Sequence, residues 1–514
     1  MTVVFSDMHA SSGQAAGQRA GHRAGRARLR LPGSGLRRWH GWIMEHLRAR
    51  GFQVVVELLD GARDDLPAAL DHLLMVEQAL YGGAFGLARM DAAQLPMAGA
   101  AGDARGDAPE VVIDLAHGAG AGRGAGLRAL FDGAPSLAVM VDALLAGRAP
   151  ELAVAVEGRV VALGLPAVED FAVLGRAADF VLARMAEGLA RLAAHPRAGA
   201  EEVARTPSAP RGVAVKSAAH VARHLAGKLL ARLTRRLTGA SPWPAWNVGW
   251  RKVEDAAHSL RAARRQPDMA QYAFLPHDGR RFFGDPFGFV HEGRVHVFVE
   301  EFPHATGKGI ISAFTLDAQG RPGPVRPVLE ADVHLSYPQV FAHDGDIWMI
   351  PETEQARQVR LYRCIEFPHR WAREAVLIAD RALSDATVVR HQGRWWMFAA
   401  ERAPHGSSWD GLAVFHAERL TGPWVEAGHA PVLLDAGAAR PAGAMWHDAQ
   451  GNLMRVAQDC RGSYGRGMAI CRVARLDEGG FAQQIIERLG PRAPFTGLHT
   501  LNLAGGFELI DAVN

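Results

Sequence analysis

The chain has 514 residues, with 57 Lys and Arg against 54 Asp and Glu, which leaves a formal charge of +3. This length exceeds what a single ordinary core occupies, so we expect more than one domain. The balanced charge gives no reason to expect a nucleic-acid partner. Because no apolar run approaches the roughly 20 residues that span a bilayer, we expect no transmembrane segment.

The N-terminal residues and the cysteines indicate the compartment. Residues 1–27 lack the apolar stretch of a secretory signal and are rich in Gly, Ala, Ser and Arg, so we interpret them as a disordered tail. Cys364, Cys460 and Cys471 cannot all pair and follow no metal-ligand spacing, and for Cys460 and Cys471 we favour two buried free thiols. These features favour a cytoplasmic protein.

Residues 28–200 alternate strand-like and helical patterns. The sequence predicts strands at 28–32, 53–59 and 110–116, a hairpin at 152–164, and helices at 36–50, 65–82 and 167–194. This order is typical of an α/β domain, with a small open sheet that carries helices on its faces.

Residues 201–245 are predicted to form a linker that contains a basic amphipathic helix. Within 214–238, six Lys and Arg residues lie among five apolar residues that recur four apart: Val221, Leu225, Leu229, Leu233 and Leu237. Such a helix either makes a peripheral contact with an anionic membrane surface or covers another part of its own protein, which is the more common role.

Residues 246–514 consist of short β-type segments with frequent turns. Four segments share a His, a Gly-containing turn and a strand that ends near an acid, and their markers His291, His343, His391 and His447 are 52, 48 and 56 residues apart. A weaker fifth copy covers 502–512. This period matches a four-stranded blade, so the sequence predicts an all-β five-bladed β-propeller. A sandwich of ordinary hairpins is the alternative, but it gives no reason for a near-constant interval.

The first residues of each predicted inner strand are candidates for a site at one mouth of the propeller. They are Asp285, Tyr337, Asp385, Arg440 and His499. The second strand of each hairpin returns to the same mouth. It adds a second set of acids, namely Glu300 or Glu301, Glu352 or Glu354, Glu401 and Asp459.

Carboxylates beside an Arg and a His suit a polyhydroxylated ligand, and aromatic side chains would cover the apolar face of a sugar. Candidates for that cover are Trp348, Trp395, Trp396, Trp409 and Tyr337. The same set permits glycoside cleavage, which needs one carboxylate as base or nucleophile and a second carboxyl held protonated as acid. For substrate contacts we favour Glu301, Tyr337, Arg440, Asp459 and His499, and we expect neither a cofactor nor a metal.

The region from residue 246 to 514 resembles known propellers. It is similar to those of glycoside hydrolase families 43 and 32, and most of all to the N-terminal domain of plant glucosamine inositolphosphorylceramide transferases and its bacterial relatives. The resemblance rests on WNVGWR, GDPFGFVHEGRVHVFVEE, SYPQVF, IWMIPETE, SDATVV, RPAG, AQDC and GLHTLN.

In family 43 an Asp at an inner strand of the first blade is the base, and a second Asp tunes the acid. By motif these roles fall on Asp285 and Asp385. The fourth blade has Arg440 and Pro441 where an acidic residue would be sought, so hairpin geometry offers Glu352 and Glu401 as substitutes for the acid.

The first domain is similar to formyltransferases of the methionyl-tRNA type, through RRWHGWIMEHLRARGFQVVVELL and PEVVIDLAHG. Those enzymes use an Asn, a His and an Asp, with the His on an HPS-type loop that this chain lacks. Asp114 and His117 are the remnants, which implies a degenerate domain that has lost formyl transfer. A retained one-carbon or acyl transfer to an amino sugar held by the propeller is the alternative.

Two functions of different classes follow. The first is a carbohydrate-active protein that assembles or modifies a glycan or glycolipid and takes a glycan, glycolipid or nucleotide-sugar ligand. The second is a non-catalytic propeller that binds a glycan or a protein, with the first domain as scaffold. An acidic side chain about 5 to 10 Å from Asp285 favours catalysis, whereas Arg440 and His499 alone favour binding.

Overall fold

The computed structural model describes residues 2–4, 25–96, 110–116, 126–156, 159–195, 245–254, 258–262, 266–276 and 278–513. The chain divides into two compact units: Met1–Thr238 with Ala403–Gly406, and Gly239–Arg402 with Ser407–Asn514. The predicted basic helix within 214–238 and His117 lie outside the described residues.

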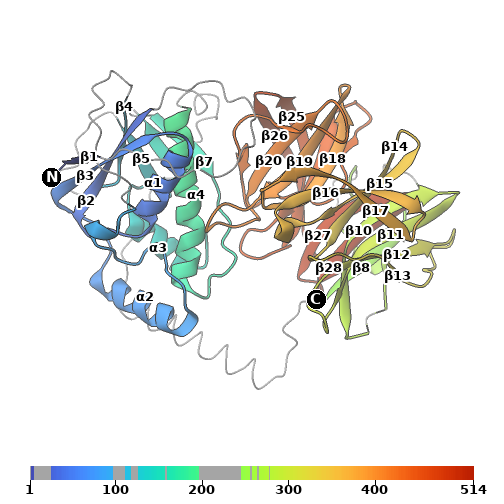
Figure 1. The fold of residues 1–514 in the computed structure, drawn as a ribbon. Coiled ribbons are helices and arrows are strands. Elements are labelled where there is room, and N and C mark those ends of the chain that lie inside the picture. Colours follow the sequence, from blue (N-terminus) through green and yellow to red (C-terminus); the bar gives the residue numbers. More distant parts are fainter. Residues whose placement is uncertain are drawn as a thin grey trace. The chain divides into compact units, whose positions relative to one another are not determined.

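The N-terminal unit is built on a mixed seven-stranded sheet in the order β1-β3-β2-β4-β5-β6-β7 (Figure 1). Its strands are β1 (Thr2–Val4), β2 (Arg26–Ser34), β3 (Gln53–Arg63), β4 (Glu110–Asp114), β5 (Leu127–Phe131), β6 (Leu152–Val156) and β7 (Arg159–Gly164). Strands β2 to β5 run parallel, while β1 and the β6–β7 hairpin are antiparallel. The predicted α/β class is confirmed. Strand β1 lies within the stretch interpreted as a tail.

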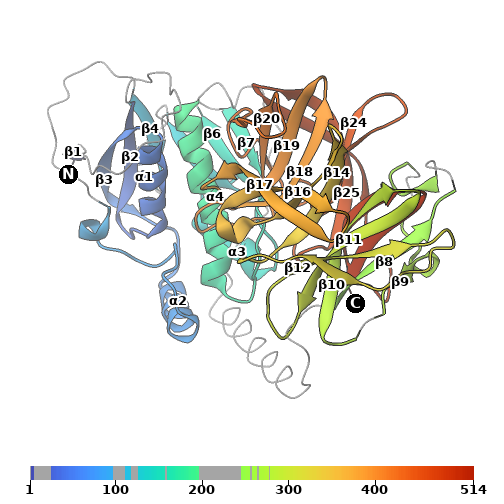
Figure 2. The same ribbon diagram turned by 45° about the vertical axis from the view of Figure 1, so that its right-hand side comes forward.

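The described part of the N-terminal unit also contains four α-helices: α1 (Trp39–Ala49), α2 (Ala68–Tyr81), α3 (Leu137–Leu145) and α4 (Leu174–Ala194). Helix α1 buries Trp39, Ile43 and Leu47, which are four residues apart and so share one face. Helices α1 and α3 pack against α4, and Figures 1 and 2 both show α1 beside α4. The sequence patterns did not predict α3 and β5, because a short, almost wholly apolar segment has no clear period.

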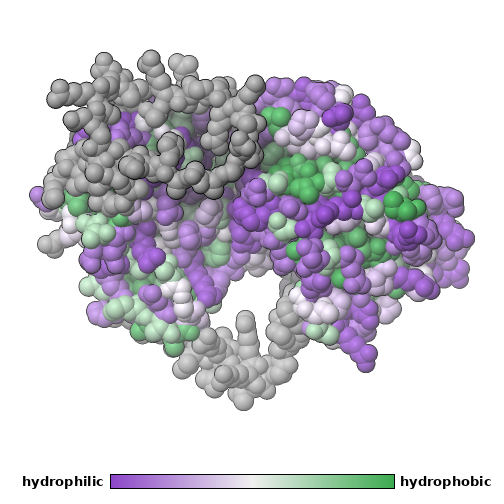
Figure 3. Space-filling model, in the orientation of Figure 1, coloured by the Kyte–Doolittle hydropathy of each residue, from purple (hydrophilic) through white to green (hydrophobic). Residues whose placement is uncertain are grey.

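Helix α2 carries exposed large hydrophobic side chains. Met75, Val76 and Leu80 of α2 are exposed, and Figure 3 shows hydrophobic side chains over this helix on an otherwise mostly hydrophilic face. Within the described ranges, no helix combines the length and the apolar character needed to cross a membrane.

The second unit is a five-bladed β-propeller, as predicted. Three blades follow one another in strict chain order. The first is β10 (Arg281–His291), β11 (Arg294–Pro303), β12 (Ile310–Leu316) and β13 (Arg326–Leu329). The second is β14 (Ser336–His343), β15 (Asp346–Glu352), β16 (Gln358–Glu366) and β17 (Arg370–Ala379). The third is β18 (Leu383–His391), β19 (Arg394–Glu401), β20 (Gly411–Ala417) and β21 (Val425–Glu426), with β22 (Leu433–Leu434) also paired to β20.

The last two blades are less regular, the fourth in the length of its inner strand and the fifth in its chain order. The fourth has a short inner strand, and its strands are β23 (Trp446–His447), β24 (Leu453–Asp459), β25 (Gly467–Asp477) and β26 (Gly480–Leu489). The fifth joins β27 (Gly497–Ala504) and β28 (Phe507–Val513) to β8 (Trp246–Lys252) and β9 (Ala273–Phe274). Strand β28 pairs with β8 from Phe507↔Lys252 to Val513↔Trp246, so the two ends of the unit close the ring. The weak fifth copy in the sequence is half of a blade.

The repeated His that marks the sequence period lies at or beside the hairpin turn of its blade. His343 packs edge-on against Trp395 of the next blade, with ring centroids 4.9 Å apart. His391 stacks on His447 of the following blade at 5.2 Å. The marker therefore serves packing between neighbouring blades.

Candidate functional site

A β-bulge near the start of the inner strand sets the site residues in four of the blades. The ladder register breaks after Gly284, Ser336, Ser384 and Leu498. In three of these bulges the next residue is left-handed, with φ of 50° at Asp285, 45° at Tyr337 and 54° at Asp385. Asp tolerates this conformation, but it is uncommon for a residue as bulky as Tyr. Backbone strain of this kind concentrates at functional sites.

The bulges and the adjoining strand ends bring together side chains of all five blades, which we call the axial cluster. It consists of Asp285, Glu300, Glu352, Asp385, Arg440, Gln458, His499 and Asp511. The inner strands that carry it, β10, β14, β18 and β27, contact one another in the series β27–β10–β14–β18.

One half of the axial cluster is centred on His499. Its Nε2 lies 3.1 Å from Asp285 Oδ1, and its Nδ1 lies 3.0 Å from Asp511 Oδ1 in an ion-pair contact that lacks hydrogen-bond alignment. The Thr500 hydroxyl donates to Asp285 Oδ1 at 3.0 Å, and Asp511 accepts from the backbone N–H groups of Asp285 and Thr500, both at 2.9 Å. Every one of these side chains is buried.

The charges of this half follow from its contacts. Burial alone would lower the pKa of His499, but Asp511 and Asp285 outweigh burial and raise the pKa to about 10. Burial alone would raise the pKa of Asp285, but His499 and Thr500 outweigh it and lower the pKa. His499 is therefore an imidazolium beside an ionised Asp285 at neutral pH.

The other half of the axial cluster is centred on Arg440. Its guanidinium is bidentate on Asp385, with Nε 2.6 Å from Oδ2 and a terminal nitrogen 3.2 Å from Oδ1. Gln458 also donates to Asp385 Oδ2 at 2.8 Å. Glu352 Oε2 accepts from the Asp385 backbone N–H at 3.1 Å and lies 3.5 Å from Arg440. Burial raises the pKa of Asp385 and Arg440 opposes this shift. We regard the pair as ionised because Arg cannot lose its charge.

Tyr337 connects the two halves. Its backbone N–H donates to Asp285 Oδ2 at 3.2 Å, and its hydroxyl accepts from Gly443 N–H at 2.6 Å and lies 3.0 Å from Thr387 Oγ1. The Tyr337 side chain is completely buried, so it supports the site from behind. The proposed cover of a sugar by Tyr337 does not fit this burial.

Glu300 joins the axial cluster and its neighbour Glu301 does not, although Glu301 is the residue that we favoured. Adjacent strand residues point to opposite faces. Glu301 lies 2.5 Å from Arg281 and accepts from Ser312 at 2.6 Å. Glu300 is buried near Asp285, and burial, together with the charges of Asp285 and Glu352, raises its pKa well above the usual range. Glu300 Oε1 also lies 3.3 Å from His334 Nε2, and the pKa values of Glu300 and Asp285 are shifted in opposite directions.

Two further candidates have partners away from the axial cluster. Glu401 forms a bidentate ion pair with Arg381, at 2.5 and 2.7 Å. Asp459 is held by Arg461 at 2.6 Å and by Arg488 at 3.3 Å, and the preceding residue, Gln458, is the one that reaches Asp385. Because neighbouring residues of a strand point to opposite faces, the strand pattern could have indicated that Gln458 and not Asp459 faces the axial cluster.

Of the tryptophans expected at the axial cluster, the structure places Trp409 beside it. Trp348, Trp395 and Trp396 belong to hydrophobic clusters within the blades. Trp409 is partly exposed and packs on Tyr464, with ring centroids 5.4 Å apart. Tyr464 lies 5.3 Å from the Arg440 guanidinium and 5.2 Å from the His499 ring. Tyr464 lies in the loop between β24 and β25, so it is not part of the strand repeat that marks the blades.

Asp285, His499 and Asp511 also offer ligand atoms within 4.8 Å of one another, a spacing compatible with a metal ion. A metal would have to displace a proton from His499, since only a neutral imidazole binds metal. Because the pKa of His499 is raised to about 10, its imidazolium already forms ion pairs with Asp285 and Asp511 at neutral pH.

Replacing Glu300 with Gln is expected to make stability less dependent on pH. The pKa of Glu300 in the folded protein is raised well above its ordinary value in an unfolded chain, so wild type loses stability as pH rises from that ordinary value through the folded pKa. The neutral amide avoids this loss, and we expect the variant to be more stable than wild type by about 1–2 kcal/mol near pH 8. Urea unfolding between about pH 5 and 8 measures the difference. Glu292→Gln, at an exposed turn, is the control, and parallel pH profiles of wild type and Glu300→Gln would contradict the assignment.

Comparison with known proteins gives one family match. Residues 274–489 match the family model described as "Glucosamine inositolphosphorylceramide transferase 1, N-terminal". The chain is 33% identical over 198 residues to glucosamine inositolphosphorylceramide transferase 1 of Oryza sativa subsp. japonica, and 30% identical over 202 residues to the protein of that name from Arabidopsis thaliana. Each alignment covers 38% of this chain and 26% of the relative. The chain thus spans about a quarter of the length of these relatives.

Solved structures of glycoside hydrolases are also similar to this chain. A mutant of the GH43 protein BlXynB from Bacillus licheniformis is 20% identical, with 45% of each chain covered and a TM-score of 0.31. The catalytic domain of the GH62 α-L-arabinofuranosidase of Coprinopsis cinerea is 11% identical, with 50% of this chain and 84% of that chain covered and a TM-score of 0.36. The family match confirms the predicted resemblance of the propeller, whereas the likeness of the first domain to formyltransferases stays a prediction.

Proposed function

We propose that the propeller binds the sugar part of a glycan or glycolipid at the axial cluster, and that the protein acts in the assembly or modification of such a molecule. The observation that carries this proposal is the composition of the axial cluster, where ionised carboxylates, two cations and a protonated acid lie together beside Trp409 and Tyr464. Charged and amide groups exchange hydrogen bonds with hydroxyl groups, and aromatic rings cover apolar faces. The match to a family named after a glycolipid transferase adds support.

The contacts of Asp285 favour binding over catalysis as the primary role. Its two oxygens already accept from Tyr337 and Thr500 and pair with His499. A base that activates water would need one of these positions free. Glu352 is more accessible, with a side chain 13% exposed, and is therefore our first choice for a direct contact with ligand hydroxyls.

Glycosyl chemistry is the second candidate, and Glu300 is the observation that favours it. Hydrolysis or transfer at a glycosidic bond needs a protonated carboxyl beside an ionised one. Glu300 and Asp285 have pKa values shifted in opposite directions, which meets this electrostatic requirement. In this scheme Glu300 protonates the leaving oxygen as the glycosidic C–O bond breaks, and Glu352 takes the proton of the water or acceptor hydroxyl that bonds to the anomeric carbon.

A glycan array probed with the labelled full-length protein tests the proposal. We expect binding to sugar-bearing ligands that falls at least about tenfold in Glu352→Gln, because one charge-assisted hydrogen bond is lost. Glu401→Gln is the matched control, since this Glu ends the corresponding strand of the next blade but is held by Arg381. The proposed site would be refuted if the array shows no bound glycan. It would also be refuted if Glu352→Gln and Asp285→Asn both bind glycans as tightly as wild type.

Turnover separates the two candidates. Any glycan that binds is incubated with the protein and analysed by mass spectrometry for cleavage or transfer. If the axial cluster is catalytic, Glu300→Gln is expected to reduce turnover by about 10²-fold or more while binding persists. A bound glycan that wild type leaves unchanged, with and without nucleotide sugars, would leave binding as the function.

A further inference from the structure

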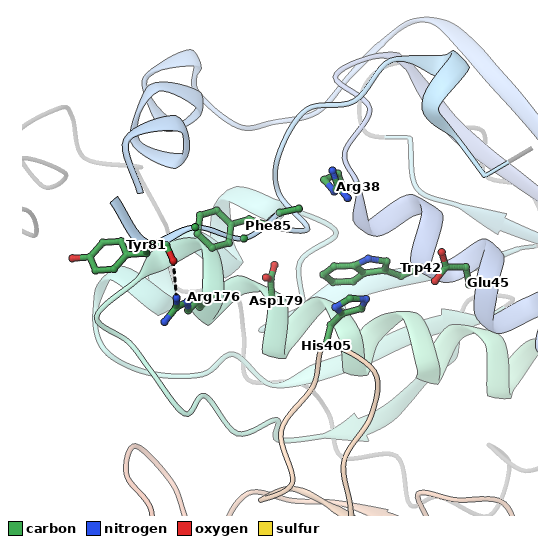
Figure 4. Close-up of a pocket in the computed structure, with 11 residues that line it drawn as sticks. Arg38, Trp42, Glu45, Tyr81, Phe85, Arg176, Asp179 and His405 are labelled. Atoms are coloured by element: carbon green, nitrogen blue, oxygen red, sulfur yellow. Dashed lines mark hydrogen bonds between the residues drawn. The ribbon is translucent and has the colours of Figure 1, made fainter. Parts of the chain in front are cut away.

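The N-terminal unit contains a cavity that the axial cluster does not involve. Its volume is about 460 Å³, which lies within the usual range for small-molecule sites. Figure 4 shows its lining, in which aromatic and charged side chains come from α1, α2, the segment after α2, α4 and the loop with His405, whose ring stacks on Trp42 with centroids 4.3 Å apart. The residues used below are Arg38, Trp42, Tyr81, Phe85, Arg176 and Asp179.

Asp179 differs from three other acids of this unit, which are paired with arginine side chains. Asp64 and Asp71 pair with the buried Arg37 at 2.6 and 2.5 Å, and Asp114 pairs with Arg128 at 3.3 Å. In the described part of this unit Asp179 forms no ion pair, and Oδ1 accepts one hydrogen bond, from Gly86 N–H at 2.6 Å. A partly buried carboxyl that lacks a cation within bonding distance is typical of a binding or catalytic position.

The backbone around Asp179 is fixed, so the cavity is formed before any ligand binds. Gly86 donates to Asp179, and its carbonyl accepts from Trp39 N–H at the start of α1 at 3.0 Å. A Cβ at Gly86 would lie 2.5 Å from the Trp42 ring, so only glycine fits between the indole and Asp179. Arg37 also donates to the carbonyl of Leu87 at 2.6 Å, which anchors the same segment.

The lining indicates the chemistry of a ligand. Arg38 and Arg176 are exposed, and Arg38 has no ion-pair partner among the described residues, so guanidinium donors are available at the rim. Arg176 is positioned by a hydrogen bond to the Tyr81 carbonyl at 3.1 Å. Trp42 and Phe85 border the cavity with little of their surface exposed, and in Figure 4 the Asp179 carboxyl lies between them. Burial raises the pKa of Asp179 to about 7, so half of these carboxyls are neutral near that pH and repulsion of an anion is reduced.

We propose that this cavity binds a small organic anion that carries a planar ring, with Arg38 and Arg176 contacting the anionic group and the accessible edge of Trp42 contacting the ring. Guanidinium groups recognise carboxylates and phosphates through paired hydrogen bonds. The aromatic edge supplies an apolar contact that an anion alone cannot make. This site is independent of sugar binding by the propeller.

Isothermal titration of the full-length protein with phenyl phosphate tests the proposal, because this probe combines a ring with an anion. We expect saturable binding of phenyl phosphate. We expect binding at least about tenfold weaker for inorganic phosphate, which lacks the ring, and for phenol, which lacks the phosphate group. Arg38→Gln and Arg176→Gln are each expected to weaken phenyl phosphate about five- to tenfold. Arg48→Gln, on the same helix as Trp42 but outside the lining, is the matched control.

Asp179→Asn tests the polarity of the site, since Asn preserves the acceptor for Gly86 N–H. At mildly alkaline pH we expect this variant to bind phenyl phosphate more tightly than wild type, because a negative charge beside the anion is removed. The proposal is overturned if phenyl phosphate fails to bind at about 10 mM. It is also overturned if both cavity arginine variants bind like Arg48→Gln, or if Asp179→Asn weakens binding.

Discussion

Replacing Arg440 with Met is expected to lower the free energy of unfolding of the propeller by about 3–5 kcal/mol. Arg440 is the bidentate partner of Asp385, and both side chains are almost completely buried. The variant leaves the Asp385 carboxylate with the Gln458 amide but without a cation. Folding must then either bury an unpaired charge or protonate Asp385, and both outcomes cost free energy.

Urea unfolding followed by tryptophan fluorescence measures this loss, because ten of the twelve Trp residues follow residue 239 and so report mainly on the propeller. Arg475→Met is the control, since Arg475 pairs with Asp477 in a largely exposed position where an ion pair contributes about 1 kcal/mol or less. The double variant Arg440→Met with Asp385→Asn should recover part of the loss. Equal stability of Arg440→Met and Arg475→Met would contradict the buried ion pair.

Stability is expected to decrease as pH rises from about 6.5 to 10, and His499 is the cause. Its pKa is raised from 6.5 to about 10 in the folded protein, so between these values the native state binds one proton more than the unfolded state. This contribution is complete below the unfolded pKa and is lost as pH rises through the folded pKa. The slope is about 1.4 kcal/mol of unfolding free energy for each pH unit.

The difference between wild type and His499→Gln reports this contribution together with the changes in the pKa of Asp285 and of Glu300, which both depend on the charge of His499. We expect wild type to lose its advantage progressively over this pH window and the difference to vanish near its upper end. An NMR titration of the His499 ring nitrogens gives the pKa directly and does not require the variant to fold. A ring that titrates near pH 6.5 would contradict the contacts with Asp285 and Asp511.

The sequence determined those features of the propeller that depend on neighbouring residues. Turn glycines and strand alternation act over a few residues, so the hairpins that follow His291, His343 and His391 could be read directly. The period of this pattern then gave the number of blades. The start of each inner strand followed from the same pattern, which is why Asp285 and Asp385 were found.

Tertiary structure decided which neighbouring side chain faces the axial cluster. Glu300 and Glu301 are equivalent by composition, but pairing of Gly284 with Glu300 directs one towards Asp285 and the other towards Arg281. Asp511 carried no signal because its role depends on contacts with backbone groups more than ten residues away. Long-range contacts of this kind leave no local pattern.

The closure of the ring and the cavity of the N-terminal unit also could not be predicted from local sequence patterns. Strand β8 pairs with β28 across more than 250 residues, so no spacing rule could join them. Asp179 lies on an ordinary helical face in the sequence and becomes distinctive only where Gly86 and Trp42 approach it. The sequence by itself thus determined the repeat, the turns and the strand starts of the propeller, because these are local. Tertiary structure alone decided which carboxyls are charged, because charge depends on burial and on partners that folding brings together.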